Sequence, residues 1–173
     1  MHIHILGISG TFMGSLAVLA KESGAKVTGS DLKSYPPISN QLENLNIEVI
    51  PNYDVDQLKL KPDLFVIGNV MSRGMPIIEK ILTQNLPYTS GPRWLKENIL
   101  KNKQIVAVSG THGKTTTASL ITFILKDLGI DTGYLIGGIP VGFEHSSNIG
   151  TDPYFVVEAD EYDTAFFDKR SKF

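Results

Sequence analysis

The chain has 173 residues, of which 42% are hydrophobic, 20% charged and 9% aromatic, a composition typical of a folded globular protein and not of a disordered one. Its formal net charge of −2 includes no basic surplus, so we expect no nucleic-acid partner. It has no cysteine, which excludes disulfides, thiol catalysis and cysteine-ligated metal.

No run of the sequence approaches the ~20 apolar residues that a membrane-spanning helix needs. The N-terminus has no basic region followed by a long apolar stretch, so it does not resemble a signal peptide. We therefore expect a cytoplasmic protein with no membrane insertion. The sequence leaves the oligomeric state open.

The first hundred residues alternate short apolar runs with helical patterns, which is typical of βαβ units in a parallel sheet. We expect buried strands at residues 3–6, 26–28, 47–50 and 64–67. Helices are expected where apolar residues recur at helical spacing, namely at Met13, Leu16, Ala17 and Ala20, at Leu42 and Leu45, after Pro76, and after Pro92 with Trp94 in the core.

The polar residues 101–104 break this pattern, and the same cycle of strand, glycine loop and helix then restarts. We expect a strand at residues 105–108, a helix with Ala118, Ile121, Leu125 and Leu128 on its apolar face, and strands at residues 134–136 and 154–157. The fold class is therefore α/β, with a Rossmann-like parallel-sheet domain at residues 1–100 and part of a P-loop ATPase-type domain at residues 101–173. The second unit is shorter than the ~100–150 residues of a typical domain, so we expect a fragment of a longer protein.

The sharpest local motif spans residues 109–117, between an apolar strand and an amphipathic helix, where a phosphate-binding loop belongs. Its glycines let backbone N–H groups approach an anion at the helix N-terminus. Lys114 would reach the β- and γ-phosphates, and the Thr115 hydroxyl would bind Mg²⁺. The match is incomplete, because Val108 stands where the first glycine of the usual pattern belongs, and a strand–helix turn with an incidental lysine is the alternative.

A weaker glycine loop follows the first strand. Its glycines lie at positions 7, 10 and 14, and Ser9 and Phe12 stand where a dinucleotide-binding fingerprint has its second and third glycines. This spacing argues against NAD, although a diphosphate could still bind at the helix N-terminus and Asp31 could bind a ribose hydroxyl. A tight turn with no ligand is the alternative.

Carboxylates follow the strand at residues 155–157, in the segment Glu158-Ala159-Asp160-Glu161-Tyr162-Asp163. Hard oxygen ligands at the carboxyl end of a parallel strand, in the same domain as a phosphate loop, suit Mg²⁺. A solvated acidic turn is the alternative.

Elsewhere, His2 and His4 alternate on the first strand and are expected to serve packing or to lie on the surface.

These three motifs, residues 110–117, 7–14 and 158–161, resemble those of the Mur ligase superfamily. Its members have a UDP-sugar domain, a central ATPase domain and a C-terminal domain that closes over ATP. The resemblance implies that this chain contains the first, part of the second and none of the third.

Within that superfamily the sequence is most similar to the murein peptide ligases, through residues 2–7, 35–37, 68–74, 90–92 and 166–173. Ser9 departs from the cysteine or glycine expected there. The resemblance implies ATP- and Mg²⁺-dependent formation of an amide between UDP-N-acetylmuramate and the murein tripeptide L-Ala-γ-D-Glu-meso-diaminopimelate, in peptidoglycan recycling. The reaction would pass through an acyl phosphate, and the fragment alone would be inactive.

The resemblance also implies roles for individual residues. Lys114 and Glu158 would be catalytic, and Thr115 and Glu158 would bind metal. The ATP phosphates would lie on Gly110, Thr111, His112, Gly113, Lys114, Thr115 and Thr116. The UDP-sugar would lie on Gly7, Ser9, Gly10, Thr11, Phe12, Met13, Gly14, Ser30 and Asp31. Three alternatives stay open: a UDP-N-acetylmuramate–L-alanine ligase, an NAD-dependent oxidoreductase and a non-catalytic nucleotide-binding module.

Overall fold

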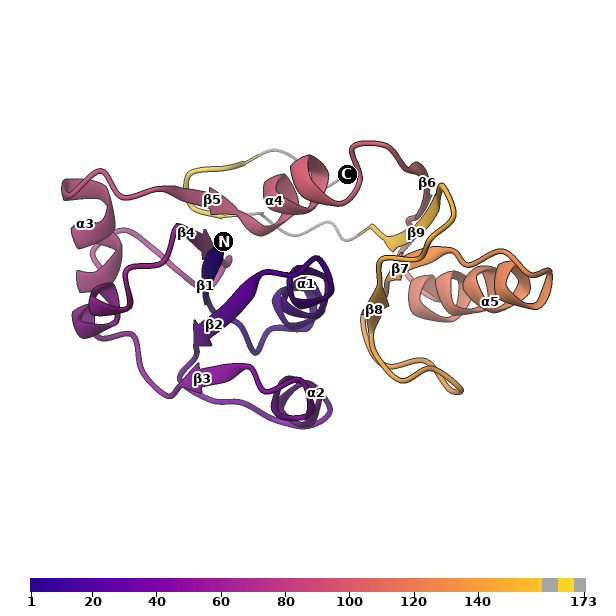
Figure 1. Ribbon diagram of the computed structural model, residues 1–173, viewed down its shortest axis with the longest axis horizontal. Helices are drawn as coiled ribbons and strands as arrows, with labels where there is room; N and C mark the ends of the chain where they lie inside the picture. The colour runs from indigo at the N-terminus through magenta and orange to yellow at the C-terminus, as the bar shows by residue number, and fades with distance from the viewer. Residues whose placement is uncertain (160–164, 170–173) are drawn as a thin grey trace.

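The computed structural model describes residues 1–159 and 165–169. It confirms the α/β class, with two mainly parallel sheets lying side by side and helices between and outside them (Figure 1). Among the residues described, no helix is long and apolar enough to cross a membrane.

The first sheet has five parallel strands in the order β3-β2-β1-β4-β5. All five carboxyl ends therefore lie along one edge, which is where ligands bind in open α/β sheets. The strands are β1 (His2–Leu6), β2 (Lys26–Ser30), β3 (Glu48–Ile50), β4 (Leu64–Ile67) and β5 (Tyr88–Ser90).

Helices cover both faces of this sheet. Three of them lie on the face that looks toward the second sheet, and a 3-10 helix and one α-helix lie on the other face (Figure 1). The first group is α1 (Thr11–Glu22), α2 (Ile38–Asn44) and α4 (Gly91–Asn98), and the second is η1 (Val55–Leu60) and α3 (Pro76–Thr83). Trp94 on α4 is 1% exposed, which confirms it as a core residue.

The second sheet has the order β6-β9-β7-β8, in which the first three strands are parallel and β8 is antiparallel to β7. The helix α5 (Lys114–Asp127) packs on β9 and β6, whereas α1 of the first unit contacts β7 and β8. The strands are β6 (Gln104–Val108), β7 (Gly133–Leu135), β8 (Ser147–Asn148) and β9 (Tyr154–Glu158).

The helix α1 is shared by both sheets. Every residue from 13 to 20 is buried, including Val18 and Leu19 outside the expected apolar face. One hydrophobic cluster joins α1 and the first sheet to Leu135, Phe155 and Val157 of the second. Helices that are apolar on every side are usually buried on every side. The helix α1 is buried in this way, between the two sheets.

Buried hydrogen bonds join the same two units. Gln41 on α2 accepts from the backbone N–H of Ser146 at 2.8 Å through Oε1, and its Nε2 donates to the Ser146 hydroxyl at 3.0 Å. That hydroxyl lies 2.7 Å from the Ser15 hydroxyl on α1. All three residues are buried, so the contact between the units is specific as well as apolar.

The sequence prediction for α5 was partly wrong. Ala118 is buried and Ile121 and Leu125 pack beside it, but Leu128 is 69% exposed. The helix ends at Asp127, so Leu128 is its C-cap, and the chain turns at Gly129, which has a φ of +79°. The short elements η1, β5 and β8 were not predicted.

His4 on β1 makes stability depend on pH. Its ring is fully buried, lying 2.8 Å from the Thr28 hydroxyl through Nδ1 and 2.9 Å from Gln57 Oε1 through Nε2. Burial lowers the pKa of His4 to about 4 from an ordinary 6.5. Between these values the unfolded chain binds a proton that the folded chain does not, so stability is lost as pH falls.

We expect His4 to remove about 2 kcal/mol of unfolding free energy between about pH 7.5 and about pH 5. Urea unfolding at the two pH values measures this loss. The variant His4→Gln cannot titrate and should show a smaller loss than the wild type, whereas His2→Gln should change it less. An equal loss in His4→Gln would contradict the assignment.

Candidate functional site

The three glycines of the first loop have three different tasks. Gly7 has a φ of +81°, and its backbone N–H donates to the Ser30 carbonyl at 2.9 Å, which turns the chain out of β1. Gly10 is the N-cap of α1 and has no side chain to occupy the helix N-terminus. A Cβ on Gly14 would lie 2.6 Å from Ile38 Cγ2, so Gly14 allows α1 and α2 to pack closely.

Some side chains of this loop pack against α4, and others are exposed to solvent. Met13 is buried, and a Cβ on Gly91 would lie 2.8 Å from its Sδ and 2.9 Å from Phe12 Cε1, so both side chains pack on α4. Thr11 is exposed. Phe12 and Met13 can therefore meet a ligand through their backbone, at the positive end of α1.

Asp31 braces the first loop. Its Oδ2 accepts from the Ser9 backbone N–H at 2.9 Å, and its Oδ1 accepts from the Leu32 N–H at 2.8 Å and the Tyr53 hydroxyl at 3.0 Å. Burial and the Asp31 carboxylate raise the pKa of Tyr53, which keeps this hydroxyl a donor. The sequence did not indicate Tyr53. The hydroxyls of Ser9 and Ser30 are buried without a hydrogen-bond partner, which suits a polar ligand or water.

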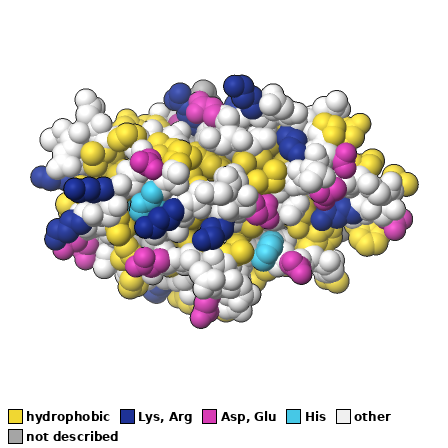
Figure 2. Space-filling view, in the orientation of Figure 1, with side chains coloured by type: hydrophobic (Ala, Val, Ile, Leu, Met, Phe, Trp, Pro, Cys, Tyr) yellow, Lys and Arg dark blue, Asp and Glu magenta, His cyan; other side chains and the backbone are white. Residues whose placement is uncertain are grey.

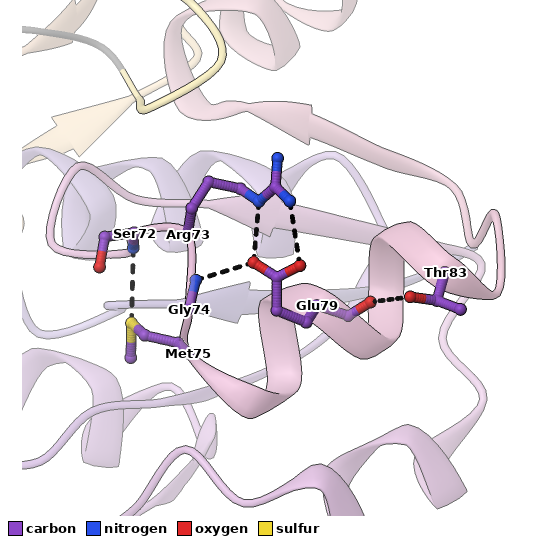
Figure 3. Close-up of polar contacts among 6 residues, drawn as sticks. All are labelled: Ser72, Arg73, Gly74, Met75, Glu79 and Thr83. Atoms are coloured by element: carbon purple, nitrogen blue, oxygen red, sulfur yellow. Dashed lines mark hydrogen bonds and ion pairs between the residues drawn. The ribbon is translucent and has the colours of Figure 1, made fainter.

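The loop after β4 lies beside the first loop, since a Cβ on Gly7 would lie 2.8 Å from Val70 Cγ2. Glu79 on α3 holds it, with Oε1 accepting from the Gly74 N–H at 2.7 Å and from Arg73 Nε at 2.8 Å (Figure 3). The Arg73 guanidinium lowers the pKa of Glu79. Both side chains are exposed, so the pair orders the loop more than it stabilises the fold.

The second loop has the geometry of an anion site. Gly110 and Gly113 have φ values of +148° and +74°, which suit glycine, and α5 begins at Lys114. Lys114 Nζ donates to the Gly110 carbonyl at 2.8 Å, so the ammonium lies over the loop. The residues between and after the glycines are exposed, namely Thr111, His112, Thr115 and Thr116.

Glu158 and Thr115, the two residues expected to bind metal, lie together. Strand β9 pairs with β6, so Glu158 lies opposite Val108 at the start of the loop. The Thr115 hydroxyl donates to Glu158 Oε1 at 2.9 Å, and the Gly137 N–H donates to Oε2 at 2.7 Å. A Cβ on Gly137 would lie 2.7 Å from Oε2, so a larger residue here would displace the Glu158 carboxylate, and its place just after a strand was the available signal.

A hydroxyl and a carboxylate fit Mg²⁺, which prefers oxygen ligands and keeps several positions for phosphate and water. Among residues 1–159 and 165–169, no group of three or more histidine, aspartate or glutamate side chains could hold a metal ion. The predicted acidic residues Asp160, Glu161 and Asp163 lie outside the described residues, as does Tyr162.

Comparison with known proteins gives one family. A model described as "Mur ligase family, catalytic domain" matches residues 2–103. The UDP-N-acetylmuramate–L-alanyl-gamma-D-glutamyl-meso-2,6-diaminoheptandioate ligase of Haemophilus influenzae is 58% identical over 99% of this chain and 38% of that protein. The solved murein peptide ligase of Psychrobacter arcticus has 52% identity and a TM-score of 0.95, over 99% of this chain and 40% of that one.

A more distant relative is the UDP-N-acetylmuramate–L-alanine ligase of a Psychrobacter species, which is 34% identical over 95% of this chain and 34% of that protein. The chain thus spans less than half the length of each of these proteins.

Proposed function

The chain belongs to the Mur ligase family, and we propose that it is the N-terminal part of a ligase that uses ATP to join UDP-N-acetylmuramate to L-Ala-γ-D-Glu-meso-diaminopimelate. The observation that carries the proposal is the second loop, where Thr115 donates to Glu158 beside the Lys114 ammonium. The relative at 58% identity supports this substrate pair over the alanine ligase at 34%.

The chemistry must turn a carboxylate into an electrophile. A carboxylate resists attack by an amine until one oxygen becomes a leaving group, which phosphorylation achieves. Lys114 would turn from the Gly110 carbonyl to the β- and γ-phosphates and offset the charge between two anionic reactants. Held by Thr115 and Glu158, Mg²⁺ would supply further charge neutralisation.

The UDP-sugar would lie on the first loop. Its diphosphate would meet the N-terminus of α1 at residues 10–13, where Gly10 leaves the backbone accessible. Asp31 would hold the loop in place for it. A nicotinamide cofactor fits less well, because the acid expected on its ribose already accepts three protein hydrogen bonds.

We further propose the division into domains at residues 1–100 and 101–173, with the second completed by a longer protein. An apolar stripe on α5 supports this proposal, because a finished domain would cover it. Figure 2 shows hydrophobic side chains on the surface at the α5 end of the molecule. The exposed side chains are Leu120, Phe123, Ile124 and Leu128. A cytoplasmic location stays a prediction.

Calorimetric titration with UDP-N-acetylmuramate tests the proposal, with NADH as the control ligand. We expect saturable binding of the UDP-sugar, in the range of about 1 μM to 1 mM, and none of NADH. The chain alone should form no amide when ATP and the tripeptide are added. Binding of NADH in place of the UDP-sugar would favour the oxidoreductase instead.

A further inference from the structure

Glu158 has two protein donors, one for each carboxylate oxygen. The Thr115 hydroxyl donates to Oε1 at 2.9 Å, and the backbone N–H of Gly137 donates to Oε2 at 2.7 Å. Strands β7 and β9 are parallel neighbours, so Gly137 and Glu158 leave the sheet at the same edge. A charged acceptor makes such hydrogen bonds stronger than those between neutral groups. The carboxylate is therefore held at both oxygens, by residues from two different parts of the chain.

Gly137 also makes a close approach to the carboxylate, because it has no side chain. A Cβ on Gly137 would lie 2.7 Å from Glu158 Oε2, 3.3 Å from Cδ and 3.4 Å from Oε1. These three nearest atoms all belong to the Glu158 carboxyl group. Gly137 is thus a contact surface for the carboxylate as well as its donor.

The backbone around Gly137 is itself held in place. The neighbouring Ile136 N–H donates to the Ser146 carbonyl at 2.9 Å, and the Gly138 N–H donates back to the Ile136 carbonyl at 2.8 Å. Ser146 is fully buried, and its own N–H donates to Gln41 Oε1 at 2.8 Å. The Gly137 N–H therefore has a defined position, and a donor of defined position orients the carboxylate that it holds.

These contacts leave the two oxygens of Glu158 in different surroundings. Oε1 lies beside Thr115, whose hydroxyl can donate to a carboxylate and still offer a lone pair to Mg²⁺. Oε2 lies against the Gly137 backbone. A carboxylate that rotates freely can offer one oxygen or both to a cation. A donor that holds Oε2 therefore selects Oε1 as the oxygen that a metal ion meets.

We propose that Gly137 is a positioning residue for Glu158, in which the N–H holds Oε2 and the absence of a side chain leaves room for the carboxylate to offer Oε1 to Mg²⁺ beside Thr115. The inference rests on the proposed function, because that function places Mg²⁺ at Thr115 and Glu158. Hydrogen-bond partners of metal ligands contribute about 10- to 100-fold to metal affinity or activity. Gly137 would act through Glu158 and not by touching the metal.

The substitution Gly137→Ala tests the proposal, because it keeps the N–H and adds the Cβ that would displace the carboxylate. The displaced atoms are the far end of a flexible side chain, so the midpoint of urea unfolding should stay near the wild-type value. In calorimetric titrations with Mg²⁺ present, we expect ADP to bind about tenfold more weakly to the variant than to the wild type. In EDTA the two proteins should bind ADP equally.

Gly138→Ala is the matched control. It adds the same methyl group one position further along the chain, where nothing lies within 4 Å of a Cβ. Neither Gly137 nor Gly138 has a positive φ, so alanine strains the backbone at neither position. Gly138→Ala should bind ADP within about twofold of the wild type, both in Mg²⁺ and in EDTA.

A double variant separates an effect through Glu158 from an effect on the loop itself. If Gly137 acts through the carboxylate, Gly137→Ala should add no further loss of affinity in Mg²⁺ when Glu158→Gln is already present. A loss of the same size in both backgrounds would overturn the proposal. Equal affinities of Gly137→Ala and the wild type in Mg²⁺ would overturn it as well.

The hydrogen bond can also be measured without ligands, by amide hydrogen exchange of the 173-residue chain followed by NMR. Glu158→Ala should speed exchange at Gly137 about tenfold and leave Ile136, whose N–H donates to Ser146, unchanged. Unchanged exchange at Gly137 would contradict the proposal. The proposed function is decided separately by the wild type: if Mg²⁺ does not raise its affinity for ADP, the metal site itself is wrong, and the role of Gly137 falls with it.

Discussion

Replacing Lys114 with methionine is expected to weaken binding of Mg²⁺–ATP by about 100-fold, equivalent to about 3 kcal/mol. The substitution keeps the length of the side chain and removes the ammonium, which lies 2.8 Å from the Gly110 carbonyl above the loop. Three or four phosphate charges would then face only backbone N–H groups and the metal. Calorimetric titration with a non-hydrolysable ATP analogue measures the loss.

Lys126→Met is the matched control, because it removes an equal charge from the same helix while its ammonium lies over the Tyr134 ring, 5.1 Å from the centroid. It should leave the affinity within about twofold of the wild type. The variant Glu158→Gln distinguishes the contribution of the metal from that of Lys114. It should weaken binding of the ATP analogue in Mg²⁺ and leave binding in EDTA unchanged. Equal losses in Lys114→Met and Lys126→Met would show a general charge effect and not a phosphate site.

The order of strands and helices could be predicted because local patterns determine it. The runs at residues 3–6 and 64–67 are apolar and short, and the loops that follow them are rich in glycine. The strand β5 was missed because Tyr88–Ser90 has three residues, one of them exposed, and so gives no apolar run. A hairpin at residues 165–168 was missed because its partners, Tyr88 and Ser90, lie far away in the sequence.

The second buried side of α1 could not be predicted either. Its apolar residues fit a helix against one sheet, and nothing local indicates that a second sheet covers Val18 and Leu19. The candidate site, too, could be predicted only where local sequence determines it. The glycines at positions 7, 10 and 14 indicated a loop, but only the fold shows that Gly14 serves contact with Ile38 and that Asp31 holds Ser9.

Asp31→Ala is expected to lower the unfolding free energy by about 2–3 kcal/mol and the affinity for UDP-N-acetylmuramate by at least about tenfold. The carboxylate accepts from the Ser9 N–H, the Leu32 N–H and the Tyr53 hydroxyl, and the variant leaves all three without this acceptor. Urea unfolding and calorimetric titration of the same preparation measure the two effects.

Two further variants distinguish a brace from a direct ligand contact. Tyr53→Phe removes one of the three hydrogen bonds and leaves Ser9 held, so it should cost about 1 kcal/mol of stability and little affinity. Asp31→Asn keeps one carbonyl oxygen but cannot accept from both Ser9 and Leu32 as the carboxylate does. If Asp31 braces the loop, stability and affinity fall together in Asp31→Asn. If it binds the ribose directly, affinity falls while stability stays near the wild-type value, and the role assigned to Asp31 is wrong.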